Sequence, residues 1–315
     1  MIIELTTVDG KKITVDKFTE LCFTQTAGVA CDSLWTTFIS DNRIDDIDSV
    51  KLYINYKLVF SGLCDCQKST YDTNGFEIYF YARSTACILV DNEAEPYTYQ
   101  HPSAKQLCFS LAEGMGFSNS LPDISSTNQY EITKGTSCYG AISQFVLLLT
   151  GKHINITPKN DIELISESSE VKNLNDYDIL SLTETINRSE PLSQIQFKQN
   201  SSQEKYNLHT KSMLCDKLGI NRTKFINLNS LPRWQRDNTV LLQLKSSFEN
   251  YRILEVNVHG YADEPLLQRF NCITNHKSYN DYILTERKFI CTEKGTVTKL
   301  TLKKQIDIKE ITYVD

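Results

Sequence analysis

The stretch Ser49 to Asn92, SVKLYINYKLVFSGLCDCQKSTYDTNGFEIYFYARSTACILVDN, predicts antiparallel strands. Between Lys51 and Phe60, two sets of side chains alternate with a period of two, which is the period of a strand. Gly62 interrupts this alternation before an extended run resumes. A glycine inside a strand pattern is typical of a bulge or a bend. We therefore expect one strand that is bulged or bent at Gly62.

A turn follows at Asp72-Thr73-Asn74-Gly75, because Asn and Gly tolerate the positive φ that tight turns require. Residues 76–81 then return as a strand rich in aromatic side chains. Shorter extended runs upstream, before residue 48, predict four further strands. Residues 1–92 together are therefore expected to form a small antiparallel β-barrel or sandwich.

From Glu93 the pattern changes to that of helices. Apolar residues recur at spacings of three and four after Pro102, and glycines follow at 114 and 116. A second helix is expected between a cap at Thr136 or Ser137 and Gly151. A hairpin is expected over 154–165. Residues 93–166 are therefore predicted to be a small α+β module.

The remaining sequence returns to β structure. Residues 177–185, 193–199 and 205–210 alternate, and strands resume from Leu254 to the region before the C-terminus. Between them, residues 211–253 predict a short helix that ends at Gly219 and a stronger helix from Asp237 to about Arg252. We expect a second β-barrel made of 167–210 plus 254–315, interrupted by a helical insertion over 211–253.

The length, the net charge and the distribution of apolar residues limit the classes of function that fit this chain. With 315 residues, the chain is long enough for two to four compact units, and its net charge of −6 disfavours sequence-independent binding of nucleic acid. No apolar run approaches the roughly 20 residues needed to cross a bilayer. No secretion signal is recognisable at the N-terminus, so we expect synthesis and retention in a cytosol until assembly.

We expect no cofactor and no metal. The sequence has no glycine-rich phosphate loop, and its five histidines are dispersed. The ten cysteines contain no Cys-X-X-Cys pair and are interpreted as reduced thiols, most of them in cores. Cys64-Asp65-Cys66 places two thiols on one face of a strand, without a histidine partner. Residues 41–49 are acidic but lack the glycine and the closing glutamate of a calcium loop, so a solvated turn is expected.

One enzymatic alternative rests on Cys138, which lies in the first turn of a predicted helix, where the helix dipole lowers a thiol pKa. His153 or His209 would then act as the base. The pattern is faintly similar to the helix-borne cysteine of cell-wall peptidases. It lacks their Asp before and Ser-Gly after the cysteine, and His153 falls at the opposite end of the helix. We interpret Cys138 as a packing residue.

Two sets of residues resemble a known family. The first set is Phe60-Ser61-Gly62, Ala82-Arg83-Ser84 and Leu89-Val90-Asp91, which resembles the end of the first β-barrel in the baseplate hub proteins of contractile phage tails. Relatives of that family occur in phage-tail-like bacteriocins and injection machines. The sequence departs from the pattern at Ala82, where the family usually has Gly, and at Cys87-Ile88, where it usually has Ala-Asp.

The second set resembles the C-terminal barrel of the same family. It consists of the segment 256–261, which includes Gly260, followed by Leu266 and Asn271, then 282–284, and finally 295–302, which begins at Gly295. An aromatic residue often seen near Leu267 is absent. The two sets follow the family's order and cover about half of the chain.

The resemblance implies a fold that is mainly β with α+β modules, in which two antiparallel, tail-tube-like β-barrels flank and are interrupted by small helical segments. It implies a non-enzymatic structural protein of the tail baseplate in a virion or tailocin particle, made in the host bacterial cytoplasm. Its partners would be two further copies in a homotrimer, the spike, the tail tube or a tube initiator, and the tape-measure protein. Baseplate wedge proteins are further candidates.

In that family, paired barrels in a trimer place six barrels in one ring, which adapts a six-fold tube to a three-fold spike. The structural motif residues would be Gly62, Arg83, Asp91, Gly260 and Gly295, with an Arg83–Asp91 ion pair at the exit from the first barrel. Trp234, flanked by arginines, is either an interface anchor or a buried residue of its own domain. The alternative function is a β-rich receptor- or glycan-binding tail component.

Overall fold

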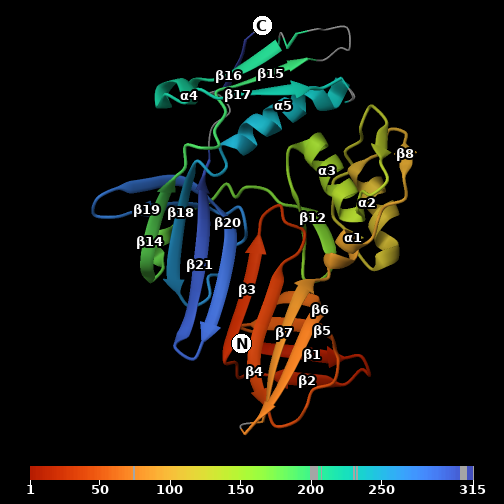
Figure 1. Ribbon diagram of the computed structural model, residues 1–315, viewed down its shortest axis with the longest axis vertical. Helices are drawn as coiled ribbons and strands as arrows, with labels where there is room; N and C mark the ends of the chain where they lie inside the picture. Colours follow the sequence, from red (N-terminus) through yellow and green to blue (C-terminus); the bar gives the residue numbers. More distant parts are fainter. Residues whose placement is uncertain are drawn as a thin grey trace.

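The computed structural model describes residues 1–73, 75–198, 205–206, 208–229, 231, 233–305 and 311–314. Strands dominate it, and most of them belong to one 13-stranded sheet. Figure 1 shows two β units side by side, a helical module beside the first of them, and a mixed layer that includes the helix α5 above the second. The expected fold class, mainly β with α+β modules, is confirmed.

The first β unit contains seven strands that enclose one core. Its strand order in the sheet is β3-β4-β7-β6-β5-β1-β2, with antiparallel pairing throughout. Alternate residues point into a core that contains Phe23, Phe60 and Phe80. The strands are β1 (Ile2–Thr7), β2 (Lys12–Val15), β3 (Glu20–Thr26), β4 (Ser33–Ser40), β5 (Ile47–Ile54), β6 (Lys57–Asp72) and β7 (Gly75–Ser84).

The expected strand over 51–60 is wrong, because the chain reverses inside it. Asn55 and Tyr56 adopt positive φ values of 50° and 62°, so that β5 and β6 form a hairpin with Ile54 paired to Lys57. Two successive residues with positive φ are typical of a type I′ turn. The expected bulge is also displaced, because the register between β6 and β7 shifts between Cys64 and Cys66.

The α/β module has its own core, built around Leu107, Ile142 and Phe145. Ser137 caps α3 by accepting a hydrogen bond from the Gly140 amide, and Gly151 ends that helix with φ at 67°. Both helix boundaries agree with the sequence prediction. The elements are α1 (Cys87–Asp91), β8 (Tyr97–Tyr99), α2 (Ala104–Ala112), η1 (Glu113–Met115), β9 (Ser118–Asn119), β10 (Tyr130–Ile132), α3 (Cys138–Thr150), β11 (Ile154–Ile156) and β12 (Asp161–Leu164).

The second β unit surrounds a separate core that contains Val256, Phe270 and Leu300. Its main strand order is β14-β18-β21-β20, and β19 pairs with both β20 and β13. Its elements are β13 (Val171–Asn173), η2 (Leu174–Asp176), β14 (Ile179–Ile186), β18 (Arg252–His259), β19 (Arg269–Ile273), β20 (Ser278–Thr292) and β21 (Gly295–Lys304).

The strands predicted over 193–199 and 205–210 do not join this second unit. They pair with each other and with two other strands in a separate four-stranded sheet, which packs on α5 around Ile195, Val240 and Leu244. We call this part the insert. It consists of β15 (Gln194–Lys198), β16 (Leu208–Ser212), α4 (Met213–Leu218), β17 (Thr223–Asn227), α5 (Arg233–Ser247) and β22 (Ile311–Val314). Local alternation predicted these strands but not the sheet they join.

The two β units repeat one pattern of strand pairing. In the first unit β6 and β7 pair Asp72 with Gly75, Cys66 with Tyr81 and, across the bulge, Cys64 with Ala82. In the second unit β20 and β21 pair Thr292 with Gly295, Glu286 with Thr301 and, across the bulge, Leu284 with Leu302. Each of these residues of the second unit has a number 220 higher than its counterpart in the first unit (72 to 292, 75 to 295, 81 to 301).

The same offset extends to the neighbouring strands. Between β4 and β7, Ser33 pairs with Arg83, and between β18 and β21, Ile253 pairs with Lys303. Between β5 and β6, Ser49 pairs with Leu63, and between β19 and β20, Arg269 pairs with Ile283. The order β5-β6-β7-β4-β3 therefore corresponds to β19-β20-β21-β18-β14. Five strands agree in order, and four of them also share one offset in register, which indicates a duplicated unit.

Among the described residues, no helix combines the length and the apolar character needed to cross a membrane.

Candidate functional site: the seam between the two β units

The two β units are joined by a continuous ladder of backbone hydrogen bonds. The outer half of β20 pairs antiparallel with β3, from Glu286 opposite Thr26 to Thr292 opposite Glu20. This ladder makes one sheet out of two units that have separate cores. An edge strand exposes unpaired backbone donors and acceptors, and here each unit satisfies an edge of the other. We call this junction the seam.

Apolar side chains cross the seam. Phe289 of β20 is 2% exposed and belongs to the core of the first unit, where it lies opposite Phe23. Its ring packs edge-on against Tyr261, with centroids 5.1 Å apart. Burying a phenylalanine in this way contributes roughly 1.5–3 kcal/mol, so the seam contributes to the stability of the first unit.

A buried guanidinium ties three segments together at the seam. Arg287 of β20 is 6% exposed. Its Nη1 donates to the carbonyl oxygens of Ala262 and Glu264 at 2.7 and 2.8 Å, and its Nη2 donates to Oε1 of Gln25 on β3. The guanidinium also lies over the Tyr261 ring, 5.2 Å from the ring centroid. A buried charge is tolerated only when it has such partners, and here they satisfy both Nη groups, whereas Nε of Arg287 is buried without a hydrogen-bond partner in the described part of the chain.

The network continues into the first unit through Asp32. Nε2 of Gln25 donates to Oδ2 of Asp32 at 2.7 Å, and the Asp32 amide donates to the Ser84 hydroxyl at 3.1 Å. Burial raises the pKa of Asp32 to about 6, while the Gln25 hydrogen bond and the Arg287 charge act in the opposite direction. The carboxyl group therefore titrates at the seam within a mildly acidic range.

Sequence reasoning missed this network. A signal was present, because Arg287, Phe289 and Cys291 alternate on one face of the strand and two of them are apolar. A charged residue at an inward position of a strand indicates a buried polar contact. The partners Gln25 and Asp32 lie more than 250 residues away in the sequence, and no local pattern connects them to Arg287.

Arg83 and Asp91 do form an ion pair. Nη2 of Arg83 lies 2.8 Å from Oδ2 of Asp91, and Asp65 of β6 contributes a second pair with Nε of Arg83 at 2.5 Å. The Arg83 hydrogen bond lowers the pKa of Asp91. These contacts join β6, the end of β7 and α1 at the exit from the first unit. Because the Asp91 side chain is half exposed, the pair adds little stability.

Gly62 lies where two strands approach most closely. It pairs with Val50 on one side and with Ser84 on the other. A Cβ at this position would lie 2.2 Å from the Arg83 carbonyl oxygen and 2.5 Å from Cζ of Phe60. The site therefore requires glycine because of space, not because of a bulge.

The other predicted motif residues lie at strand ends. Gly260 follows β18 with φ at 79°, and its amide donates to the Thr296 carbonyl at 3.0 Å. Gly295 opens β21 in the hairpin with β20. Trp234 belongs to α5, but its side chain lies outside the described residues, so its proposed role as an anchor stays a prediction.

Cys138 is the first residue of α3 and is 2% exposed, and burial raises the pKa of its thiol. An activated cysteine nucleophile instead has a lowered pKa and an accessible thiol. His153 follows the other end of this 13-residue helix, about 20 Å away at 1.5 Å per residue, and packs against Gly28. The geometry therefore does not bring Cys138 and His153 together.

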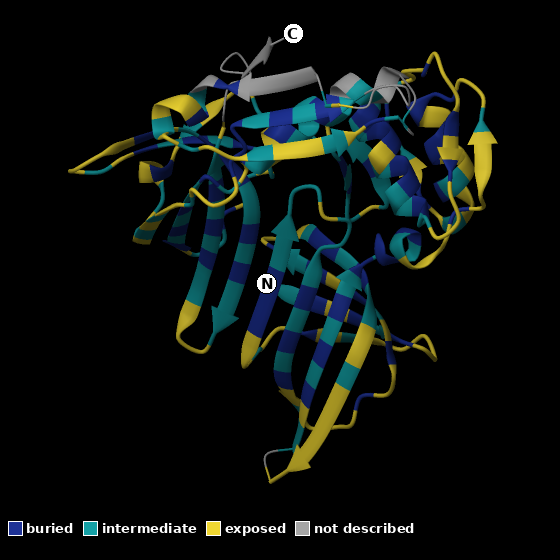
Figure 2. Ribbon diagram, turned by 45° about the horizontal axis from the view of Figure 1, so that its top comes forward, coloured by how far each residue is buried: buried dark blue, intermediate teal, exposed yellow. Residues whose placement is uncertain are grey.

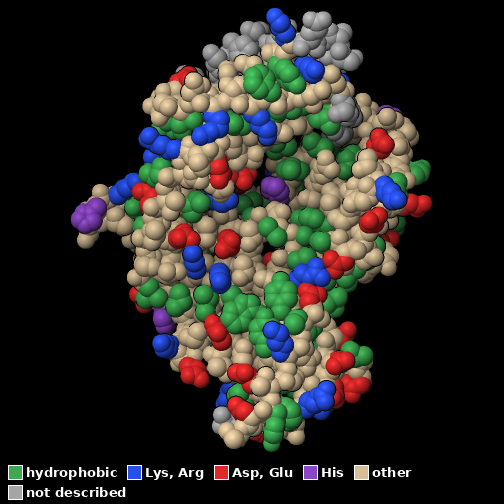
Figure 3. Space-filling model, in the orientation of Figure 1, with side chains coloured by type: hydrophobic (Ala, Val, Ile, Leu, Met, Phe, Trp, Pro, Cys, Tyr) green, Lys and Arg blue, Asp and Glu red, His purple; other side chains and the backbone are tan. Residues whose placement is uncertain are grey.

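A cleft of about 660 Å³ opens where the two β units, α3 and α5 converge, and Figure 3 shows the surface hollowed there. Its walls carry both signs of charge, from Lys152, Lys245 and Lys303 to Glu249 and Glu286. Among the described residues, no group of three or more His, Cys, Asp or Glu side chains is placed to hold a metal ion. The cleft therefore defines no single class of ligand.

Comparisons with known proteins identify the fold. No family profile matches the sequence, and no curated protein matches it. Among solved structures, the 43 kDa tail protein of prophage MuSo2 from Shewanella oneidensis is similar at a TM-score of 0.78 and 12% identity, over 96% of this chain and 97% of that one. A tail protein from Neisseria meningitidis MC58 is similar at a TM-score of 0.74 and 15% identity, over 96% of each chain.

A third similar structure belongs to an injection machine. The c3393 protein of Escherichia coli is a component of the type VI secretion system and is described as structurally similar to the T4 bacteriophage tail proteins gp27 and gp5. Its TM-score to this chain is 0.61 at 7% identity, over 92% of this chain and 74% of that one. The fold is thus shared with phage tail proteins and with this secretion-system component, and the resemblance noted in the sequence is confirmed at the level of fold.

Proposed function

We propose that this chain is the structural hub of a contractile tail baseplate, in a phage tail or a tailocin. Three copies form a ring that contains six β units, and this ring adapts a six-fold tail tube to a three-fold spike. The chain performs no catalysis in this role. Its role is structural. A duplicated unit in a three-fold assembly presents six similar surfaces to the tail tube and three identical surfaces to the spike.

The observation that carries this proposal is the repeated ladder. Two β units with the same strand order and register are joined edge to edge within one chain. A protein that needed only a binding surface would gain nothing from such a repetition at a fixed angle. In a ring of six similar units made by three copies, three of the six junctions lie within single chains, so the repetition already forms half of the ring's contacts.

The fold similarity supports the same setting. The similar proteins are tail proteins and a secretion-system component related in structure to gp27 and gp5. We propose as partners the spike on one side, the tube or a tube initiator on the other, and the tape-measure protein within. Wedge proteins would contact the outside of the ring. Specific nucleic-acid binding and membrane insertion are not part of this proposal.

Mass in solution tests the proposal. Light scattering on the purified chain, alone and mixed with the spike of the same particle, should give three times 36.1 kDa, or about 108 kDa, for the hub component. A stable monomer or dimer in both samples would contradict the hub role. A monomer that binds purified cell-wall polysaccharide would instead favour the receptor- or glycan-binding alternative.

A further inference from the structure

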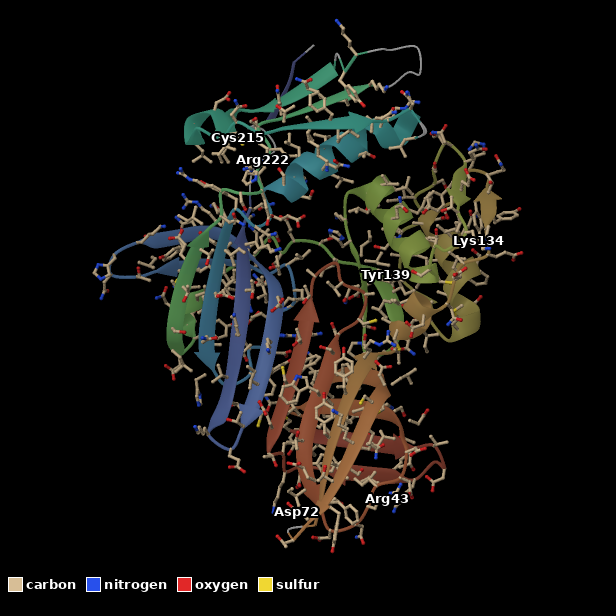
Figure 4. All side chains as sticks on the ribbon, in the orientation of Figure 1. Arg43, Asp72, Lys134, Tyr139, Cys215 and Arg222 are labelled. Atoms are coloured by element: carbon tan, nitrogen blue, oxygen red, sulfur yellow. The ribbon has the colours of Figure 1, made fainter. Side chains whose placement is uncertain are left out.

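Among the described residues, several edges of the large sheet have a partner strand on one side only, namely β2, β13, the outer half of β6 and β14, and the last two are the counterparts of the seam strands. The first of these two is the outer half of β6, residues 66–71, which we call the β6 tip edge. It pairs with β7 on one side. On the other side the ladder from β5 reaches no further than Leu63, and the Gln67 side chain forms hydrogen bonds with the Ile44 carbonyl and the Ile47 amide. Figure 2 shows this part of the hairpin as exposed, and Figure 4 labels Asp72 at its end. Tyr71 on this edge is 74% exposed.

The second is β14, residues 179–186, which we call the β14 edge. It pairs with β18 on one side, and no described strand pairs with its other side. Leu180 and Ile186 on this strand are 54% and 48% exposed. In Figure 1, β14 and the β6–β7 hairpin lie at opposite ends of the row of strands that the two units share. One copy therefore offers two different edges that face away from each other.

The repeat shows what these two edges correspond to. By the offset of 220, the β6 tip edge corresponds to the outer half of β20. By the same offset, Trp35 of β4 corresponds to Glu255 of β18. Cys22 of β3 pairs with Trp35, and Thr183 of β14 pairs with Glu255, so the β14 edge corresponds to β3. Inside the chain, these two counterparts pair with each other and form the seam. The β6 tip edge and the β14 edge are therefore the counterparts of the two strands that form the seam, but in one copy they lie too far apart to pair with each other.

Burial supports the correspondence. At the seam, where β20 pairs alongside β3 and covers its edge, Leu21, Cys22 and Phe23 are at most 2% exposed. The equivalent strand β14 has no such cover and leaves apolar side chains in water. Long exposed edges invite pairing with another chain, and proteins usually protect them. An occupant is thus expected, and the repeat identifies a strand that fits.

We infer that the β6 tip edge of one copy pairs antiparallel with the β14 edge of the next copy, in the register of the internal seam. Transferring the seam register places Thr70 opposite Thr183, Lys68 opposite Thr185 and Tyr71 opposite Leu182. The inference rests on the proposed ring, and it names the partner as a second copy of this chain. Because the two edges differ, the contact is head-to-tail and closes into a ring when the rotation between units allows it.

The chemistry of this register is compatible with a copy-to-copy contact. Tyr71 meets Leu182, which already packs at the border of the second core. An aromatic side chain opposite an aliphatic one is a favourable cross-strand pair. Thr70 meets Thr183, a β-branched pair that suits a sheet surface. Like charges do not lie opposite each other at these three positions.

Disulfide cross-linking tests the register. The test variant carries Thr70→Cys and Thr183→Cys, and the control carries Thr70→Cys and Thr185→Cys. Both use a Cys66→Ser background because Cys66 is exposed. Directly opposed residues in an antiparallel pair have Cα atoms about 4.5–5.5 Å apart, within disulfide range. A shift of two residues separates them by about 7–8 Å, which is beyond that range.

We expect mild oxidation of the test variant to give covalent dimers and trimers on non-reducing gels, at least tenfold more than in the control or in either single variant. Light scattering on the same samples reports the ring separately. A trimer mass without the specific cross-link would overturn this inference and leave the hub proposal standing. The specific cross-link with products that extend beyond trimers would support the register and contradict the three-copy ring. A monomer without cross-links at high concentration would overturn both.

Discussion

Gly62 shows how a single residue sets the spacing between strands. Its backbone lies between β5 and β7, and a methyl group there would overlap the Arg83 carbonyl oxygen. Arg83 in turn holds Asp65 and Asp91, so any shift of this carbonyl is transmitted to the exit from the first unit. The residue therefore links strand packing to the contact with α1.

We expect Gly62→Ala to lower the free energy of unfolding by about 1–3 kcal/mol, the usual cost of overpacking a core. The midpoint of urea denaturation, followed by tryptophan fluorescence, measures this loss. Gly114→Ala is the matched control, because no atom lies within 4 Å of a Cβ at that exposed position. Equal midpoints for the two variants would show that the close approach at Gly62 has no energetic consequence.

Asp32 makes the seam sensitive to pH. Burial raises its pKa in the folded protein to about 6, above the ordinary value of 3.8. The folded state therefore binds this proton more tightly than the unfolded chain does. The contribution of Asp32 to stability is present below pH 4 and is lost as the pH rises through 6.

We expect Asp32→Asn to raise the melting temperature relative to the native chain more at pH 7 than at pH 4, since the amide keeps an acceptor for Gln25 and carries no charge. Thermal scans at intervals between these pH values measure the difference. Asp41→Asn, at an exposed position, controls for the loss of one acidic group. A difference that does not change with pH would contradict the raised pKa.

At the scale of elements, the seam depends on Arg287 as well as on the ladder. Arg287→Met keeps most of the side-chain volume but leaves the Ala262 and Glu264 carbonyls without this donor. Because hydrogen bonds to charged groups contribute about 1.5–3 kcal/mol each, we expect a loss of at least ~2 kcal/mol. Hydrogen exchange should quicken in β3 and in the outer half of β20.

Lys299→Met is the control for Arg287→Met, because Lys299 pairs with Glu255 on the surface, where both side chains are more than one third exposed. Surface pairs contribute at most about 1 kcal/mol. If exchange in β3 is the same in both variants, Arg287 does not hold the seam and the ladder alone is sufficient.

Local sequence signals predicted the elements that have local causes. The caps Ser137 and Gly151 fixed α3, and the turn signal over 72–75 correctly predicted the β6–β7 hairpin, in which Asp72 pairs with Gly75. The hairpin at Asn55 and Tyr56 was missed because its positive φ values occur without glycine. The start of α5 at Arg233 lies four residues before the predicted position at Asp237.

Features with distant causes could not be predicted in this way. The sequence around Ile195 alternates as any strand does, and only its partners show that it belongs to the insert. The pairing of β3 with β20 joins segments more than 250 residues apart. The Arg83–Asp91 pair was predicted from the resemblance, whereas Gln25, Asp32 and Arg287 had no motif to identify them.

At the scale of the whole molecule, one chain contains two copies of a β unit and one copy of their junction. The α/β module and the insert flank these units without interrupting the ladder between β3 and β20. If the junction repeats between chains, the angle at the seam fixes how many units close a ring. In the proposed ring, the internal seam would serve as the template for the contact between copies.

A cryo-electron microscopy reconstruction of the assembled hub, purified with its spike and tube partners, tests this claim most directly. The account predicts six β units around the axis, three copies of the chain, and a contact between copies in which β6 and β14 superpose on β20 and β3 of the seam. A ring whose copies meet through other strands, or an assembly with a number of β units other than six, would contradict it.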